Sequence, residues 1–396
     1  MRTYNGDESS VCSRTVRGGR PGVRSRTAAI AAAVLVAMGL LFLRTPGLVL
    51  AKPHPHVDKP AYVVVASAPD EMDDTKHEAV TGGDTTKVFQ WKVPTPPAPV
   101  AKVDEYKKKH TKKVSCLAVS RGGTGPNPNK LFRASYDGHV LVSTLGDFTN
   151  GGFITFFDTF TPPPPMGPAM EVWSVAASPD GLLAVSGTNY GEITVWDADT
   201  GDLRGNVPPE TSFYPVGGLA FRKVPQGQNP QILAARDGGE VVRYELVPAA
   251  NGKIALTDMN KTFSHGNELA VNSVAVTSNG DIAVSAGFDM TVRIWNVETL
   301  AVIKDITDHK NIVWRVAISP NNDRVASASE DGTVRLYTIN GEPLIDPATN
   351  KPAVIQEPKM GGIMGVAFVT NDKVVYTAED QAGADVKVWM INGFHP

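Results

Sequence analysis

The chain has 396 residues, of which 42% are hydrophobic and 20% are charged, and its net charge is −3. This composition is typical of a folded protein and excludes wholesale disorder. Two cysteines are too few for a disulfide-rich scaffold or a zinc site built from cysteines. Residues 1–26 carry a charge of +4, which leaves −7 for the rest of the chain. An acidic body argues against nucleic acid as the main partner, because phosphate binding requires a basic surface.

Residues 28–43 contain no polar side chain and directly follow the arginine-rich segment. As a helix they would span about 24 Å, and their neighbours extend this to the low end of a membrane-spanning helix. Two interpretations are open: a signal peptide cleaved near Ala51, or an uncleaved membrane anchor. Because the positive charge precedes the apolar run, the rest of the chain is expected to be translocated. We therefore predict a single-pass membrane protein with its main domain on the non-cytoplasmic side, or alternatively a secreted or periplasmic protein.

The rest of the chain is a series of repeats. The clearest unit runs from Val172 through a Ser-Pro-Asp-Gly turn to Trp196, and similar units begin at Val271 and Val313. Short β-branched segments separated by Ser-Pro, Asn-Gly or Asp-Gly are typical of antiparallel strands joined by tight hairpins. Fainter units begin at four further positions, which are Val63, Val114, Val216 and Ile363.

These units resemble WD40 repeats over almost all of residues 61–396. The residues aligned at the end of the third strand are Trp91, Ser143, Trp196, Tyr244, Trp295, Tyr337 and Trp389. Their spacing averages about 50 residues, slightly above the usual length for this family. The resemblance implies an all-β fold, a seven-bladed WD40-type β-propeller preceded by one apolar N-terminal helix. The expected domains are a basic segment at 1–26, a signal peptide or anchor at 27–44, a linker at 45–60 and the propeller at 61–396.

WD40 blades are often braced by a His–Ser–Asp–Trp chain of hydrogen bonds. The resemblance implies this structural network in the fifth unit, with His265, Ser285, Asp289 and Trp295. It implies a shorter version in the sixth unit, with His309, Ser327 and Asp331. A catalytic triad is the competing interpretation of His, Ser and Asp, but the same trio repeats in register with the strands, which favours the structural role.

Closure of the ring requires an outer strand for the last blade, because the chain ends soon after the third strand of that blade. In this family the amino-terminal end usually supplies the strand, which removes an exposed edge. Residues 47–51 are the better candidate, since residues 52–60 contain three prolines that cannot donate to a ladder. The alternative is that residues 62–65 close the ring and the first blade is irregular.

One position, the second residue of the innermost strand, holds Trp173 and Trp314 in two well-formed units. In the WD40 family this end of the strand lies at the upper mouth of the central channel, where partners commonly bind. The resemblance therefore implies a protein-binding role for this position, which the other units fill with Ser115, Asn272 and Met364. Large aromatic side chains at such a place are typical interface anchors. The alternative is that each tryptophan packs between neighbouring blades.

The sequence contains no glycine-rich phosphate loop, nucleophile elbow or metalloprotease helix. We therefore predict no enzyme activity, catalytic residue, metal or cofactor. The leading hypothesis is a membrane-tethered, non-enzymatic scaffold that presents its upper face to a protein or peptide, with the membrane contacted through residues 28–43. The alternatives are a propeller enzyme with a metal or cofactor in the central channel, and a membrane-bound guanine-nucleotide exchange propeller.

Overall fold

The computed structural model divides the chain into two units, Met1–Leu48 and Val49–Pro396, and every described residue belongs to the second. The described ranges are 63–67, 78–83, 86–93, 101–106, 110–120, 130–145, 154–157, 170–208, 214–266, 268–347, 349–357, 362–380 and 383–391. The predicted helix at 27–44 and the candidate closing strand at 47–51 lie outside these residues.

Apart from one two-stranded hairpin, the described strands form seven antiparallel sheets in chain order, and we call each of these seven sheets a blade. Blade one contains β1 (Val63–Ser67), β2 (Glu78–Gly82), β3 (Val88–Lys92) and β4 (Ala101–Glu105). Blade two contains β5 (Val114–Val119), β6 (Lys130–Ser135), β7 (His139–Thr144) and β8 (Ile154–Phe157). Blade three contains β9 (Val172–Ala177), β10 (Leu183–Thr188), β11 (Ile193–Asp197) and β12 (Leu203–Val207). Blade four contains β13 (Val216–Arg222), β14 (Gln231–Arg236), β15 (Glu240–Pro248) and β16 (Ile254–Ser264).

Blade five contains β17 (Val271–Val276), β18 (Ile282–Gly287), β19 (Val292–Asn296) and β20 (Val302–Ile306). Blade six contains β21 (Val313–Ile318), β22 (Arg324–Ser329), β23 (Thr333–Thr338) and β26 (Val354–Gln356), with a small hairpin of β24 (Ile345–Asp346) and β25 (Lys351–Pro352) inserted before its last strand. Blade seven contains β27 (Ile363–Thr370), β28 (Lys373–Asp380) and β29 (Gly383–Met390). The described residues include one helical element, a 3-10 turn at Ala250–Gly252.

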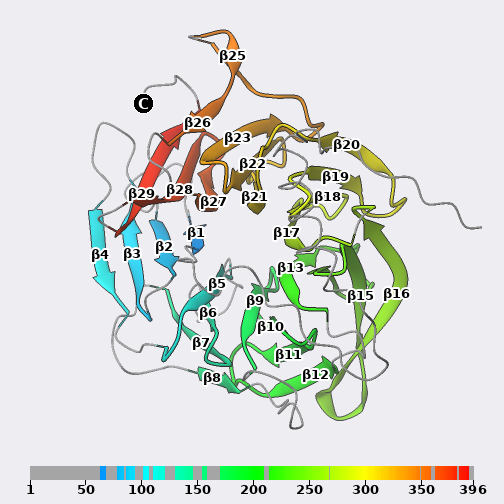
Figure 1. Cartoon of the computed structure of the whole chain (residues 1–396). Coiled ribbons are helices and arrows are strands. Elements are labelled where there is room, and N and C mark those ends of the chain that lie inside the picture. The colour runs from blue at the N-terminus through cyan, green and yellow to red at the C-terminus, as the bar shows by residue number, and fades with distance from the viewer. Residues whose placement is uncertain are drawn as a thin grey trace, which may run out of the picture. The chain divides into compact units, whose positions relative to one another are not determined.

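The innermost strands β1, β5, β9, β13, β17, β21 and β27 each contact the next, and β27 contacts β1, so the blades close into a ring (Figure 1). The prediction of an all-β, seven-bladed propeller is confirmed. Alternating strand direction places the blade-to-blade connections and the turns between second and third strands at one end of the ring. We call this end the upper face. The turns between first and second strands and between third and fourth strands lie at the other end, the lower face.

The amino-terminal end of the ring differs from one sequence-based expectation. Residues 62–65 were an alternative closing strand for the last blade, but β1 pairs with β2 as the inner strand of blade one. That alternative is therefore wrong. Within the described residues, blade seven has three strands and packs directly against blade one. Their seam buries Ala79, Val93 and Val375, and Lys373 Nζ donates a hydrogen bond to the Val93 carbonyl at 3.0 Å.

The hydrophobic core is divided among the seams of the ring. Each of the seven clusters of buried apolar side chains combines residues from two consecutive blades. Alternation along each strand explains this arrangement, since successive side chains point to opposite faces of a sheet and both faces are covered. Burial of these surfaces is the main stabilising contribution to the fold.

Six inner strands carry a β-bulge at the same position. In each of these strands, the pairing with the second strand of the blade skips the second residue. The strands are β5, β9, β13, β17, β21 and β27, and the skipped residues are, in the same order, Ser115, Trp173, Gly217, Asn272, Trp314 and Met364. Blade one pairs without a shift. A bulge leaves one residue outside the ladder and redirects its side chain. The position identified in the repeats is therefore structurally distinct from its neighbours.

In blade five, His265 connects the chain before the inner strand to the middle of the sheet. Its Nδ1 lies 2.9 Å from Asp289 Oδ2, and its Nε2 lies 2.8 Å from Ser285 Oγ. Trp295 Nε1 donates to the same Ser285 oxygen at 2.9 Å. All four side chains therefore form one continuous chain of hydrogen bonds.

Blade six brings together His309, Ser327 and Asp331, with Nδ1 of the imidazole 2.9 Å from Asp331 and Nε2 2.7 Å from Ser327. Blade two is a variant, because His110 contacts Asp137 at 3.0 Å but reaches the backbone carbonyl of Arg133 in place of a serine. Burial alone would raise the pKa values of Asp137, Asp289 and Asp331. Hydrogen bonds and charge from the partner histidines outweigh burial, so each aspartate pKa lies below its usual value of 3.8.

We predict that Asp289→Ala lowers the free energy of unfolding by about 1–3 kcal/mol, because it leaves the buried His265 without its acceptor. Asp305→Ala is the matched control in the same blade, since Asp305 forms an exposed ion pair with Arg293. Exposed pairs contribute about 0–1 kcal/mol. Equal losses in urea unfolding experiments would show that the His265 chain does not stabilise the blade.

Acid should weaken the ring through the same aspartates. A carboxylate whose pKa is lower in the folded state stabilises the protein fully above its unfolded pKa, and this contribution is lost as the pH falls through the folded pKa. The free energy of unfolding should therefore decrease below about pH 4. Asp331→Asn should make this decrease shallower between pH 5 and pH 3. An unchanged slope in the variant would contradict the assignment.

Candidate functional site

The five residues predicted to bind a partner all lie at bulges around the upper mouth of the channel. Their exposed fractions are 6% for Ser115, 8% for Trp173, 5% for Asn272, 7% for Trp314 and 7% for Met364. None of these side chains therefore offers a large surface to solvent. The structure brings them to one end of the ring, on five different blades.

The smaller side chains at this position reach the next blade. Ser115 Oγ donates to the carbonyl of Val172, and Asn272 Nδ2 donates to the carbonyl of Val313 at 3.2 Å. In both cases the acceptor is the first residue of the following inner strand. A Cβ built on Gly217 would lie 3.0 Å from the carbonyl of Val271, in the equivalent direction. The bulge thus directs this residue into the seam between consecutive blades.

The two tryptophans pack against the preceding blade. Trp314 makes an edge-on contact with Phe288 of blade five at 5.6 Å between ring centroids, and its Nε1 donates to Glu330 at 2.9 Å. Trp173 lies 6.5 Å from Tyr136 of blade two, and its Nε1 donates to Glu171 at 3.1 Å. This geometry matches the alternative in which each tryptophan packs between blades.

In the described part of the chain, one arginine crosses the central channel. Arg315 lies on β21 in blade six, and its Nη2 donates to the carbonyl of Ser115 in blade two at 3.3 Å. Its Nη1 lies 3.5 Å from the carbonyl of Asn272 in blade five. Blades two and six are not neighbours in the ring, so the side chain must span the channel between them. The equivalent residues of β5, β9, β13, β17 and β27 are all small: Cys116, Ser174, Gly218, Ser273 and Gly365.

Blade five exposes two apolar side chains on the upper face. Leu269 is 48% exposed just before the inner strand, and Met290 is 42% exposed in the turn between β18 and β19. The two segments adjoin, since the Phe288 amide donates to the Ala270 carbonyl at 2.9 Å. Phe288 in turn contacts Trp314, so the apolar surface continues to the next seam.

Met290 also has an unusual backbone. Its φ is +63°, in the left-handed region, and the same turn position in blades two, three, four and six holds Gly138, Gly191, Gly239 and Gly332. A residue with a Cβ pays about 1–2 kcal/mol for this conformation, whereas glycine does not. Such strain is concentrated at functional sites.

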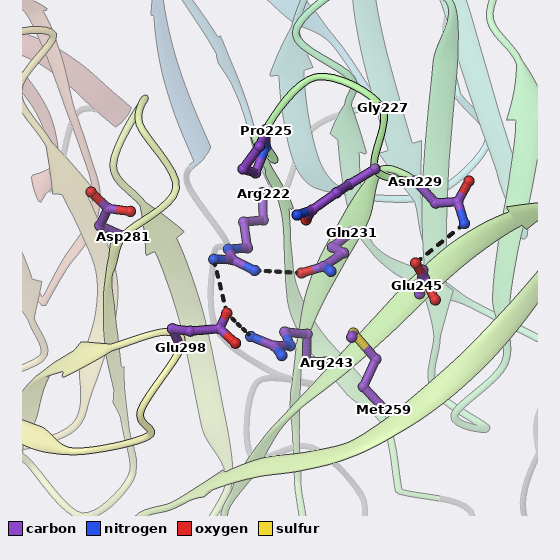
Figure 2. A pocket seen from close by; sticks show the side chains of 11 residues that line it. Arg222, Pro225, Gly227, Asn229, Gln231, Arg243, Glu245, Met259, Asp281 and Glu298 are labelled. Atoms are coloured by element: carbon purple, nitrogen blue, oxygen red, sulfur yellow. Dashed lines mark hydrogen bonds and ion pairs between the residues drawn. The ribbon is translucent and has the colours of Figure 1, made fainter.

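The lower face carries a recess of about 600 Å³ between blades four and five (Figure 2). Two arginines form part of its wall: Arg222 ends the inner strand β13, and Arg243 lies on β15. Their side chains are only 9% and 2% exposed. Asn229, Glu245 and Asp281 lie around them, with the Asn229 amide donating to Glu245 at 3.2 Å.

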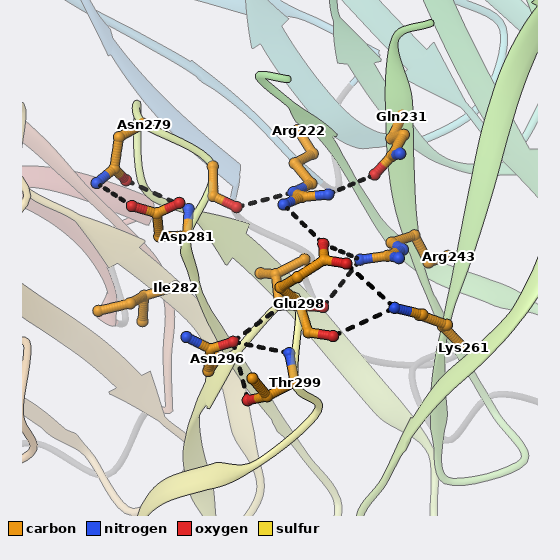
Figure 3. Close-up of polar contacts among 12 residues, drawn as sticks. Arg222, Gln231, Arg243, Lys261, Asn279, Asp281, Ile282, Asn296, Glu298 and Thr299 are labelled. Carbon is orange, nitrogen blue, oxygen red and sulfur yellow. Dashed lines mark hydrogen bonds and ion pairs between the residues drawn. The ribbon is translucent and has the colours of Figure 1, made fainter. Parts of the chain in front are cut away.

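One carboxylate from blade five connects to three cations of blade four (Figure 3). Glu298, in the turn between β19 and β20, lies 3.3 Å from Arg222, 3.4 Å from Arg243 and 3.2 Å from Lys261. The hydrogen bond from Lys261, with the charges of the three cations, holds the pKa of Glu298 below its usual value. Burial and the neighbouring Arg222 lower the pKa of Arg243, although Glu298 opposes the shift.

Sequence reasoning did not identify the recess, Arg315 or Met290. The recess residues come from positions outside the repeat pattern, and their meeting depends on how two blades pack. Met290 did carry a signal, because it follows Asp289 where the turns of blades two and six have Asp-Gly. Within the described residues, no group of three or more His, Cys, Asp or Glu side chains is placed to hold a metal ion.

We predict that Trp314→Ala lowers the free energy of unfolding by about 3–5 kcal/mol, the usual cost of truncating a buried aromatic residue. Trp314→Phe should cost less, because it keeps a ring against Phe288 and loses the hydrogen bond to Glu330. The matched control is Val302→Ala, since Val302 is 47% exposed on an outer strand. A loss for Trp314→Ala as small as that of the control in thermal unfolding would contradict the packing role.

A family model described as "WD domain, G-beta repeat" matches residues 166–197, 258–296 and 300–338. The chain is 20% identical to U3 small nucleolar RNA-associated protein 13 of Saccharomyces cerevisiae over 147 residues, which are 36% of this chain and 18% of that protein. It is 26% identical to Periodic tryptophan protein 2 of Arabidopsis thaliana over 217 residues, which are 54% of this chain and 20% of that protein. The matches thus span about a fifth of each relative's length.

The comparisons correct the predicted location. We expected a single-pass membrane protein with the propeller on the non-cytoplasmic side, or a secreted or periplasmic one, and this is wrong. One relative is named for its association with a small nucleolar RNA, which does not fit either location. Within the described part of the chain, no helix is long and apolar enough to cross a membrane. Residues 28–43 and the expected cleavage near Ala51 lie outside that part.

The matched repeats are offset from the blades by one strand. The match at 258–296 begins within β16, the outer strand of blade four, and ends with β19, the third strand of blade five. The match at 300–338 likewise runs from β20 to β23, across blades five and six. Each repeat therefore links two blades, as the shared seams of the ring require. The chain thus contains three stretches that match the WD40 repeat, and it folds as a seven-bladed β-propeller.

Proposed function

We propose that this protein is a non-enzymatic scaffold that presents its upper face to a protein or peptide partner. The observation that carries the proposal is Met290, an exposed apolar residue held at positive φ where four other blades have glycine. A side chain kept in a strained conformation on the surface is expected to have a role outside the fold. Leu269 extends the same exposed surface.

The partner should bring apolar side chains to the surface formed by Leu269, Phe288 and Met290. Methionine is flexible and polarizable, and it adapts well to different binding surfaces. The buried Trp314 supports this surface from below through Phe288. In this proposal the tryptophans shape the interface, and the exposed residues of blade five make the contact.

The comparisons fit an interaction role. Neither relative has the name of an enzyme, and the description of the matching family model names a repeat and no activity. A metal ion in the central channel is disfavoured, because Arg315 places a positive charge there. One relative is named as RNA-associated. For this chain, the acidic body still favours protein as the direct partner.

Met290→Gly provides the sharpest test, because stability and binding should change in different directions. Relief of the strained φ should leave the free energy of unfolding unchanged or raise it by up to about 1 kcal/mol. Loss of the exposed side chain should weaken partner binding at least about tenfold, as expected for a contact of more than 1.4 kcal/mol. The measurements are urea unfolding and the affinity of a partner first isolated with the wild-type chain and then purified.

Leu269→Ser should weaken the same partner, while Val302→Ser serves as the matched control on an exposed outer strand of the same blade. The control should bind normally. Unchanged affinity of the Met290→Gly and Leu269→Ser variants for every partner that the wild-type chain binds would refute a binding role for this surface.

A further inference from the structure

The recess on the lower face holds two buried guanidinium groups that share one ion-pair partner among the described residues. The guanidinium groups of Arg222 and Arg243 are almost completely buried, yet both rely on Glu298, whose side chain is 63% exposed. The same carboxylate also serves Lys261. All three distances, between 3.2 and 3.4 Å, are longer than the 2.7–2.9 Å of strong charge-assisted hydrogen bonds.

Other contacts fix the two arginines in position. Arg222 Nε donates to the Gly280 carbonyl at 2.8 Å, and its Nη1 donates to Gln231 at 2.7 Å. Arg243 Nη1 donates to the Val297 carbonyl at 2.9 Å. The Nε of Arg243 is buried and has no hydrogen-bond partner among the described residues. The two arginines are thus held in place before any ligand binds.

Backbone packing sets the distance between the two sides of the recess. Gly280 has a φ of +83°, and a Cβ there would lie 2.1 Å from the carbonyl of Lys223. Only glycine fits at this close approach of the blade-five turn to blade four. The two arginines therefore belong to a rigid seam, whereas Lys261 reaches Glu298 from the outer strand β16 and is 34% exposed. Glu298 itself lies on an exposed turn, from which its side chain can rotate away.

The number of oxygens decides which anion fits best. A carboxylate has two oxygens, and here the Glu298 carboxylate forms ion pairs with three cations from three different strands. A phosphate monoester has three terminal oxygens, one for each cation, and arginine forks match phosphate geometry well. The recess volume of about 600 Å³ lies within the range of about 300–1,000 Å³ found for small-ligand sites.

We propose that this recess binds a phosphate monoester on a side chain of a partner protein, with Arg222, Arg243 and Lys261 as its ligands. Glu298 occupies the cations when the site is free and leaves them when the phosphate enters. The acidic body of the chain favours a phosphorylated protein over a polynucleotide, since it would repel the remaining phosphates.

Two carboxylates at the edge of the recess oppose an anion. Glu245 and Asp281 both line it, and each accepts a hydrogen bond from a nearby asparagine, Asn229 at 3.2 Å and Asn279 at 2.9 Å. With Glu298 displaced, three cations face these two anions. We therefore expect moderate affinity that falls as the salt concentration rises.

The test uses the purified full-length chain and three short peptides that differ only at the central residue, which is phosphoserine, serine or aspartate. Titration calorimetry should show saturable binding of the phosphoserine peptide alone. Glu298→Gln should tighten binding about fivefold or more, because it removes the internal competitor. Lys261→Gln should weaken it about tenfold, as expected for loss of one charge-assisted bond. Lys304→Gln, which removes an exposed lysine paired with Glu342, should have no effect.

Three results would overturn the proposal. They are the absence of phosphopeptide binding to both the wild-type chain and Glu298→Gln, equal binding of the aspartate peptide, and weaker binding to Glu298→Gln. Inorganic phosphate compared with chloride at equal ionic strength separates recognition of the phosphate group from recognition of the peptide. This site is independent of the upper face, so Met290→Gly should leave phosphopeptide affinity unchanged whether or not the upper face binds a partner.

Discussion

Contact between consecutive inner strands is the constraint on which this ring depends. Among the described residues every apolar cluster is shared by two blades, so each seam must form for its neighbours to be covered. The bulge in six inner strands serves this requirement by turning one residue out of the ladder and into the seam. Ser115 and Asn272 use that position for a hydrogen bond, and Trp173 and Trp314 use it for aromatic packing.

Different interactions join consecutive blades at different seams, and an interaction that adds little stability points to a functional role. A buried ion pair stabilises little, because desolvation of the charges offsets their attraction, so arginines in a seam need a further explanation. Apolar residues could fill the space of Arg222 and Arg243 at the seam of blades four and five. In contrast, the His–Ser–Asp chains of blades five and six are fully satisfied and recur in register, as expected of elements that hold the fold.

The repeat pattern predicted the seven inner strands from their first residues, because turns and β-branched alternation are local properties of the sequence. It also identified the position of Ser115 and Trp314 as special, but not the bulge, since ladder register depends on the partner strand. Trp173 and Trp314 are buried because they pack against Tyr136 and Phe288 of the preceding blades. An alignment of the repeats compares equivalent positions and does not show such contacts between blades. Arg222, Arg243 and Glu298 meet only through packing between two blades, so no local pattern could predict their site.

Ionic strength should act unequally on the two faces. At the upper mouth the links between blades are bonds to backbone carbonyls and contacts between rings, which salt hardly affects. At the lower end of the seam between blades four and five, the arginines also donate to the Gly280 and Val297 carbonyls. The ion pairs there go to Glu298, an exposed carboxylate whose attraction to Arg222 and Lys261 is screened by salt. Anions can therefore compete with Glu298 at this seam. Because the apolar cluster of Leu233, Phe263 and Trp295 still joins these blades, an anion can enter the recess while the ring remains closed.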